Sequence, residues 1–268
     1  MKRKKRIQPV NMNDRGDRVP TTLRPIRSCA RSLSMDAQLA PHQHPWTQLT
    51  YCASGLMQVT VSQSGMQTTY IVPPSRAVWI PPHTEHTVTV LENAELRIVD
   101  LKATAMPAGW DTCRVIVVSK LLRELIHALE HATPGARDDA LMALTLDEIT
   151  HADIQALGVP LPNDKRLRAL CEAVLRAPAE RATLAEWAVD IGASERTVAR
   201  LFRTELATCY QQWRQQAILA HALPMLASGM PVSQVAYASG YASDSAFCAM
   251  FKAALGQSPG NFQNKNGA

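Results

Sequence analysis

Hydrophobic and polar residues follow two different rhythms along the chain. Between Thr47 and Leu101, short β-branched or apolar segments alternate with Gly and Pro turns, which is typical of a small antiparallel sandwich or barrel. The predicted strands are Gln48–Cys52, Leu56–Val61, Gln67–Val72, Ala77–Ile80, Thr87–Leu91 and Leu96–Leu101. After Pro107 we expect no further strands.

Beyond these strands the apolar residues recur at helical spacing. Ser119–Ala132 and Ala136–Thr150 predict a pair of helices, with Pro134-Gly135 between them. Residues 156–163, with two prolines and a glycine, are the best candidate for a linker. Farther on, the pattern predicts helices at 164–177, 184–190, 194–206, 208–227, 232–239 and 244–255.

The pattern therefore predicts an α+β chain in four parts. Residues 1–26 are polar and basic without periodicity, as in a disordered arm. Residues 27–155 form a β-rich domain with the helical pair, 156–163 the linker, and 164–268 an all-α domain. A chain of 268 residues, 46% hydrophobic and 19% charged, can bury at least one sizeable core.

Composition argues against several classes of protein. The apolar runs are far shorter than the ~20 residues of a membrane span. The basic start, residues 1–6, is followed by polar residues, so we expect no export signal and a cytoplasmic location. The six cysteines lie singly, unlike those of a zinc ribbon or a disulfide framework. From Asn163 onward 11 Lys and Arg stand against 8 Asp and Glu, whereas residues 7–162 carry 12 against 15. This asymmetry indicates a polyanionic partner for the C-terminal part.

A helix-turn-helix pattern occurs twice in the helical part, at about 184–206 and 232–255. Each copy has an alanine where two helices cross, a glycine in the turn, a capping serine and apolar residues four apart. These are Ala188, Gly192, Ser194, Val198 and Phe202 in the first copy, and Ala236, Gly240, Ser243, Phe247 and Phe251 in the second. A plain helical bundle is the alternative, but two copies in register favour a DNA-binding function.

This repeat resembles the AraC/XylS family of transcription regulators, and the resemblance extends over essentially the whole chain. It is most specific from Val235 to Lys252 and in the closing segment Gly256-Gln-Ser-Pro-Gly-Asn-Phe262. The resemblance implies two recognition helices in successive major grooves of double-stranded promoter DNA. It also implies a homodimer formed through residues 119–150, and RNA polymerase as a further partner. The alternative for residues 119–150 is ordinary packing against the β-rich domain.

Two positions depart from the family pattern. The family usually has a basic residue where this chain has Ala249, so we expect weaker base reading by the second motif. Pro224 falls within the helix that links the two motifs, where a proline removes a backbone hydrogen bond and kinks the helix unless it lies near an end.

Three arginines of the first recognition helix, Arg196, Arg200 and Arg203, fall on one helical face. Arginine can donate two hydrogen bonds to guanine or hold a phosphate, although such a stripe can also be only a solvated face. We expect Arg196 and Arg200 to read bases, and Arg203 and Lys252 to hold phosphates. The full set of expected DNA-binding residues is Ser194, Glu195, Arg196, Ala199, Arg200, Arg203, Ser243, Asp244, Ser245 and Lys252.

The β-rich part carries two histidine motifs, Pro41-His42-Gln-His44 and Trp79-Ile-Pro-Pro-His83-Thr-Glu-His86. They resemble the two motifs of the cupin fold, the small β-barrel of many AraC effector domains. The resemblance implies His42, His44 and His86, with Gln48 at the position of a glutamate, as ligands of Zn²⁺, Ni²⁺, Fe²⁺ or Mn²⁺. His83 replaces a glycine of the second motif. The alternatives are side chains that hydrogen-bond an organic effector, or histidines of surface loops.

Aromatic residues near the histidines suggest a site for a small ligand. Trp46, Tyr51 and Trp79, together with Gln48, could wall an apolar pocket with a few polar groups. We therefore expect the effector, whether metal or small molecule, to bind in the β-rich domain.

Taken with the paired motifs, these patterns favour a ligand-responsive transcription regulator that is not an enzyme. The alternative is a metal-dependent cupin enzyme with a helical accessory domain. Such an enzyme needs a substrate-specific acid or base, and Glu85 is the only carboxylate near the histidine motifs.

Overall fold

The computed structural model describes residues 19–63, 65–155, 157–180 and 183–266, and the chain divides into two compact units. The first, called here the β unit, comprises residues 1–61 and 72–155, and the second, the helical unit, comprises 62–71 and 156–268. The α+β fold class is as predicted. Within the described residues, no helix combines the length and the apolar character needed to cross a membrane.

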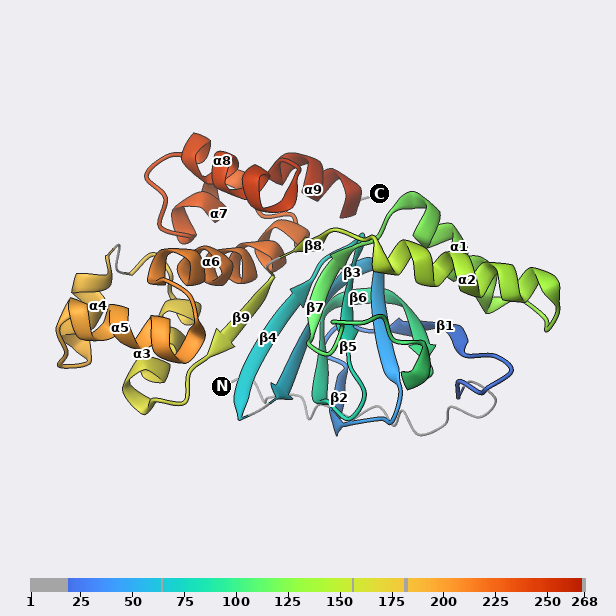
Figure 1. The fold of residues 1–268 in the computed structure, drawn as a ribbon. Coiled ribbons are helices and arrows are strands. Elements are labelled where there is room, and N and C mark those ends of the chain that lie inside the picture. Colours follow the sequence, from blue (N-terminus) through green and yellow to red (C-terminus); the bar gives the residue numbers. More distant parts are fainter. Residues whose placement is uncertain (1–18, 64, 156, 181–182, 267–268) are drawn as a thin grey trace. The chain divides into compact units, whose positions relative to one another are not determined.

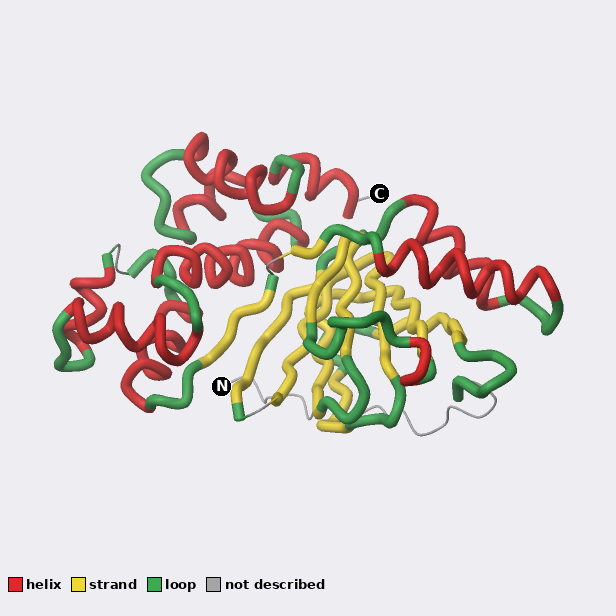
Figure 2. The backbone as a smooth tube through the Cα atoms, viewed as in Figure 1, coloured by secondary structure: helices red, strands yellow, loops and turns green. Residues whose placement is uncertain are grey.

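The β unit is built on a sheet in which the strand order is β1-β6-β3-β5-β7-β8, with β2 also paired to β6 (Figures 1 and 2). The strands are β1 Ile26–Leu33, β2 Gln38–His42, β3 Thr47–Gln63, β5 Arg76–Ile80, β6 Glu85–Leu101, β7 Arg114–Val117 and β8 Ile154–Gln155. A short 3-10 helix, Ala103–Ala105, follows β6. The pairings β1–β6, β2–β6, β3–β5, β5–β7 and β7–β8 are antiparallel.

The predicted helical pair is present as α1, Lys120–Glu130, and α2, Ala136–Thr150. Apolar side chains of both helices join those of the sheet in one core, which includes Tyr51, Trp79, Val99, Leu122, Ile126, Leu129, Met142 and Ile149. Packing against the sheet therefore uses one face of the pair. Leu121 of α1 and Leu144 of α2 lie outside this core, with 52% and 51% of their surface exposed.

The strand prediction is wrong in two respects. β3 and β6 are single long strands where the pattern predicted two short ones each. In β3 the strand continues through Ser54-Gly55, which the pattern indicated as a turn between strands. Gly55 has a φ of +78°, and a Cβ there would lie 2.1 Å from the carbonyl oxygen of Asn93 on β6, so glycine is required. Strands also continue after Pro107 as β7, β8 and β9, since segments of two to four residues are too short to show an alternation.

An ion pair anchors the start of the described chain. Arg24 Nε lies 2.6 Å from Asp138 Oδ2 on α2, and Arg24 Nη2 donates to the carbonyl oxygen of Ala132 at 3.1 Å. Ile26 is buried in the core. The prediction of a disordered arm over 1–26 is therefore wrong for residues 19–26, whereas its residues 1–18 lie outside the described part of the chain.

The helical unit contains the six predicted helices and one that was not predicted, α9. The helices are α3 Lys165–Arg176, α4 Leu184–Asp190, α5 Glu195–Leu206, α6 Tyr210–Ala227, α7 Val232–Ala238, α8 Asp244–Leu255 and α9 Pro259–Asn266. Two strands, β4 Met66–Val72 and β9 Gly158–Leu161, pair in antiparallel fashion. Thr183 and Glu186 form a capping box at the start of α4.

Of the segment expected to be a linker, 156–163, residues 157–163 are described and are structured. It contains β9, whose Val159 is 1% exposed and packs in the core of the helical unit. Trp213 Nε1 of α6 donates to the carbonyl oxygen of Pro160 at 2.8 Å. The prolines that suggested a linker are compatible with a strand at the edge of a sheet, where a missing N–H donor costs no ladder hydrogen bond.

Candidate nucleic-acid interface and ligand site

The two helix-turn-helix motifs are α4–α5 and α7–α8, and they share the same local chemistry. Ser194 and Ser243 cap the second helix of each motif by accepting a hydrogen bond from a backbone N–H, at 3.2 and 3.3 Å. Gly192 and Gly240 occupy the turns with φ of +63° and +80°, which a glycine adopts without strain. The repeat predicted from the sequence is thus confirmed in its caps and turns.

Helix α5 has one apolar face and one basic face. Val198 and Phe202 are fully buried in the core of the helical unit. The side chains of Arg196, Arg200 and Arg203 are exposed, as are those of the expected contact residues Ser194 and Glu195, while Ala199 is half-buried. The helix therefore exposes three positive charges to solvent, and the major groove of DNA is wide enough to admit an α-helix.

Helix α8 offers less positive charge than α5. Phe247 and Phe251 are fully buried, while Asp244, Ala249 and Lys252 are exposed together with Ser243 and Ser245. Lys252 is the only basic residue in the sequence of α8. Because Ala249 lies on the exposed surface, the missing basic residue there lowers the charge that the second motif presents to DNA.

The turn of the second motif packs closely against the loop that precedes the first. A Cβ on Gly240 would lie 3.0 Å from the Cα atom of Ala179 and 3.2 Å from the carbonyl oxygen of Pro178. Arg214 Nη2 of α6 donates to that same oxygen at 3.1 Å. Pro224 lies near the end of α6, where its missing N–H disturbs only the final turn. The position of the second motif is thus set by this contact as well as by α6.

In the β unit, the structure brings the three predicted histidines together. His42 of β2 lies directly opposite His86 of β6, with ring centroids 4.2 Å apart. The ring of His44 is 5.1 Å from that of His86 and 6.3 Å from that of His42. His44 and His86 are buried, and His42 is half-buried. We call these three residues the histidine cluster.

The backbone fixes the tautomer of each ring in the histidine cluster. Nδ1 of His42, His44 and His86 lies 2.8, 2.6 and 2.9 Å from a backbone carbonyl oxygen. A carbonyl oxygen only accepts hydrogen bonds, so each Nδ1 carries the proton and each neutral ring keeps a lone pair on Nε2. All three Nε2 atoms are buried. This is the arrangement in which imidazoles bind metals or accept hydrogen bonds from a ligand.

A buried carboxylate that the sequence analysis missed organises the neighbouring polar groups. Asp100 of β6, 3% exposed, accepts hydrogen bonds at 3.0 Å from Trp46 Nε1 and from Gln48 Nε2. Gln48 Oε1 in turn accepts from the hydroxyl of Thr50 at 3.3 Å. Trp46 stacks on His44, with centroids 5.3 Å apart and planes 4° from parallel. The described contacts of Gln48 are therefore with Asp100 and Thr50, and none is with the histidine cluster.

Two of the residues expected to line the effector pocket lie in the core. Trp79 is fully buried and donates from Nε1 to the carbonyl oxygen of Trp110 at 2.9 Å. Tyr51 is 4% exposed, and burial raises the pKa of its hydroxyl. His83, which stands at the glycine of the cupin-like motif, has a φ of +57° in the left-handed region, and its N–H donates to the carbonyl oxygen of His44 at 2.8 Å.

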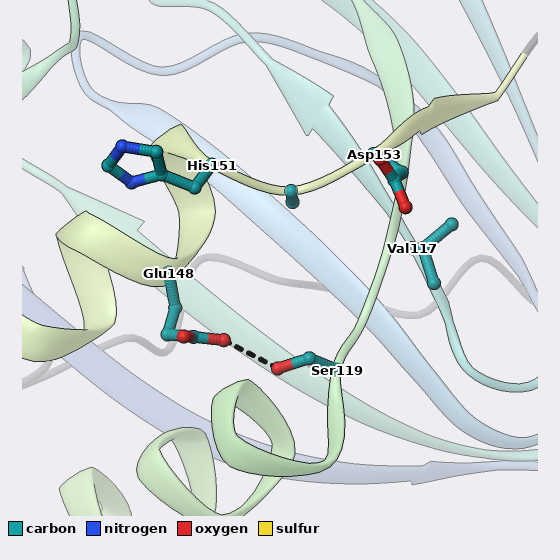
Figure 3. Close-up of a pocket in the computed structure, with 6 residues that line it drawn as sticks. Val117, Ser119, Glu148, His151 and Asp153 are labelled. Atoms are coloured by element: carbon teal, nitrogen blue, oxygen red, sulfur yellow. Dashed lines mark hydrogen bonds between the residues drawn. The ribbon is translucent and has the colours of Figure 1, made fainter.

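A separate small hollow lies between the end of α2 and the start of α1 (Figure 3). Its volume is about 150 Å³, and its lining is Val117, Ser119, Glu148, His151, Ala152 and Asp153. The hydroxyl of Ser119 donates to Glu148 Oε2 at 2.5 Å across it. Four of the six side chains are polar, and only Val117 and Ala152 are apolar, so the hollow lacks the apolar walls typical of a small-ligand site.

Two family models match this chain. Residues 28–146 match the family model of an AraC-like ligand binding domain, and residues 187–265 match that of a helix-turn-helix domain. The chain is 37% identical over 227 residues to the HTH-type transcriptional regulator NimR of Escherichia coli (strain K12), covering 82% of this chain and 81% of that protein. The chain belongs to the AraC family of transcription regulators.

Two other known proteins are less similar to the chain in sequence. The HTH-type transcriptional regulator RipA of Corynebacterium glutamicum is 30% identical over 103 residues, or 38% of this chain and 31% of that protein. A crystal structure of ToxT from Vibrio cholerae O395 is 12% identical over 90% of this chain and 98% of that chain, with a TM-score of 0.38. As an AraC-family protein, the chain is a DNA-binding transcription regulator with an N-terminal ligand-binding domain.

Proposed function

We propose that α5 and α8 insert into promoter DNA, with α5 as the stronger of the two readers. The observation that carries this proposal is the basic face of α5, where Arg196, Arg200 and Arg203 are exposed opposite a buried apolar face. Arg196 and Arg200 read bases, and Arg203 and Lys252 hold phosphates. RNA polymerase is a further proposed partner of the DNA-bound protein, which acts in the cytoplasm.

Substitutions in α5 test the division between base reading and phosphate contact. Arg200→Ala should cost about 1–3 kcal/mol of binding free energy on the preferred sequence and relax the preference in one half of the site. Arg203→Ala should weaken binding to all sequences alike and reduce its salt dependence. Arg166→Ala, which removes an exposed arginine from the first turn of α3, is the matched control.

The assay is a gel shift of the full-length protein on the gene's own upstream region over a series of salt concentrations. Binding that does not weaken between low and physiological salt would contradict the phosphate contacts. Equal losses for both α5 variants on every sequence would contradict the assigned roles.

We further propose that the effector binds at the histidine cluster and its polar neighbours in the β unit. What supports this is the burial of His44 and His86 and of the hydrogen-bonded pair Gln48 and Asp100, since polar side chains are costly to bury unless they serve a ligand or a network. A divalent ion such as Zn²⁺, Ni²⁺, Fe²⁺ or Mn²⁺ fits the three Nε2 donors. A bound ion would add a positive charge that organises an anionic or carbonyl-bearing effector. Gln48 orients Asp100 in this proposal and is not a ligand.

The double variant His42→Ala/His44→Ala tests this site. We expect it to lose metal on elemental analysis and to lose the change in DNA affinity that accompanies metal loading of the wild type. An effector changes DNA binding only if it favours one arrangement of the protein over another. His151→Ala, an exposed histidine at the end of α2, is the control. Equal metal content with an unchanged response would leave the cluster as an organic-ligand site.

We also propose a homodimer formed through α1 and α2, and no catalytic activity. The exposed leucines Leu121 and Leu144 support the dimer surface, since apolar side chains on the outer faces of both helices favour association. The regulators to which the chain is related support a non-enzymatic role. Sedimentation of the Leu121→Lys/Leu144→Lys variant tests the dimer, and a sedimentation coefficient equal to that of the wild type would contradict it.

A further inference from the structure

The last turn of α1 gathers three side chains of metal-ligating types that have no role in the DNA binding or effector binding proposed above. His127, Glu130 and His131 fall at positions i, i+3 and i+4, which lie on one side of a helix. Their ligand atoms all lie within 4.8 Å of one another, and the two imidazole rings are 5.4 Å apart. Both histidines are exposed, so an ion can reach them from solvent. We call these residues the α1 cluster.

Glu130 is held in position by the sheet. Its Oε1 lies 2.6 Å from Nε of Arg97 on β6, and its side chain is only 9% exposed. The guanidinium contact involves one of the two carboxylate oxygens, and one carboxylate oxygen of Glu130 lies within 4.8 Å of the ligand atoms of both histidines, so Glu130 can act as a ligand through a single oxygen. A carboxylate that is already ordered loses little conformational entropy when it binds an ion.

The positive charge of Arg97 disfavours a bound cation, and the C-terminal end of α1 partly offsets this effect. The cluster lies at the C-terminal end of α1, where the helix dipole and the last carbonyl groups favour positive charge. We propose that the α1 cluster binds a divalent transition-metal ion, with Zn²⁺ as the best match. Two imidazoles and one carboxylate suit zinc, whereas Mg²⁺ and Ca²⁺ prefer oxygen ligands throughout. Three protein ligands leave a coordination position for water.

The end of α2 supplies an internal comparison. His151 there lies 3.4 Å from Asp147, also at a spacing of four residues, and the two side chains are 75% and 66% exposed. This pair has an imidazole and a carboxylate but lacks the second histidine and the carboxylate anchored by an arginine. It therefore serves as a matched control for weak binding by surface side chains.

The experiment uses the full-length protein with Co²⁺ as a spectroscopic probe and Zn²⁺ as its competitor. We expect the wild type to bind Co²⁺ at the α1 cluster with visible d–d absorption that Zn²⁺ removes. His127→Ala/His131→Ala should lose that absorption and one equivalent of bound Co²⁺. Glu130→Gln should bind about tenfold more weakly or worse, by the scale of losses seen when the environment of a metal ligand changes.

Two further variants separate this site from others. His42→Ala/His44→Ala should keep the equivalent assigned to the α1 cluster, which distinguishes it from the histidine cluster, and His151→Ala should bind as the wild type does. Zn²⁺ should also raise the melting temperature of the wild type and not that of His127→Ala/His131→Ala, because an ion that binds only the folded state stabilises it. If that double variant binds as much Co²⁺, with the same affinity and spectrum as the wild type, the proposal is wrong.

Discussion

Gly240 and Gly192 occupy equivalent turns in the two motifs, yet their surroundings differ. A Cβ on Gly192 would meet no atom within 4 Å, whereas one on Gly240 would lie 3.0 Å from the Cα atom of Ala179. Both glycines have positive φ, so alanine at either position incurs a similar backbone strain. The pair Gly192→Ala and Gly240→Ala therefore isolates the effect of the close contact in the second turn.

The expected magnitudes follow from these distances. Alanine in the left-handed region costs about 1–2 kcal/mol, and this is the whole effect expected for Gly192→Ala. Gly240→Ala adds crowding against the backbone of Ala179 and Pro178, which typically costs about 1–3 kcal/mol in a packed region. The free energy of unfolding should fall by about 1–2 kcal/mol in the first variant and about 2–5 kcal/mol in the second.

The backbone can also relieve the crowding by moving the second motif away from the loop before α4. In that case the spacing between α5 and α8 changes, and a DNA site that engages both helices is no longer matched. In a DNA footprint, we expect Gly240→Ala to protect from cleavage the half of the DNA site that α5 contacts, and to leave the other half unprotected. Gly192→Ala should protect both halves at saturating protein.

Amide hydrogen exchange measures the stability of the helical unit separately from that of the β unit, and DNA footprinting measures the protection of each half. The reasoning would be refuted by equal losses of stability in the two variants together with full footprints for both. A greater loss in Gly192→Ala would refute it as well, because that turn has no close neighbour.

Two further predictions concern pH. Burial lowers the pKa of His221 below the ordinary value of ~6.5, so in the pH range between the two values the unfolded chain binds more protons than the folded chain. The free energy of unfolding should therefore fall as pH drops below about 6.5. Urea unfolding of His221→Gln should show a smaller fall, and a pH dependence equal to that of the wild type would contradict the assignment. Burial and the nearby Glu92 raise the pKa of Cys52 to about 12, so the folded chain keeps this thiol protonated where the unfolded thiol ionises near ~8.5. Stability should therefore decrease as pH rises above about 8.5, and Cys52 should react with iodoacetamide only after unfolding, as peptide mass spectrometry can show.

The helices could be predicted from the sequence because their signals are local and repeated. The capping box at Thr183, the capping serines and the turn glycines act within a few residues, and the structure confirms them. Strands depend on partners distant in sequence. The residues around Ser54-Gly55 do not show that β3 continues through them, because the close contact of Gly55 is with Asn93 of β6, far away in sequence. A strand of four residues such as β9 is too short to show a recognisable pattern.

Some residues of the candidate site could likewise be predicted from the sequence, and others could not. His42, His44 and His86 could be predicted because their motif spacing is visible in the sequence, and strand pairing brings the rings together. Asp100 was missed because its role depends on the neighbouring side chains of β3. A carboxylate within the apolar run that ends β6 was the available signal. For Gln48 the motif predicts a ligand, and its hydrogen bond to Asp100 is the observation behind the orienting role that we propose.

Residues 62–71 belong to the helical unit although they precede most of the β unit in the sequence, so the chain crosses between the units three times. A protease that cuts one crossing leaves the two units covalently joined through the others. A fragment that begins at residue 156 carries β9 without its partner β4, and an unpaired strand edge promotes aggregation. A chimaera that joins the ligand-binding domain of one relative to the DNA-binding domain of another at residue 156 would pair β4 of one parent with β9 of the other. Such a chimaera should therefore take both β4 and β9 from the same parent.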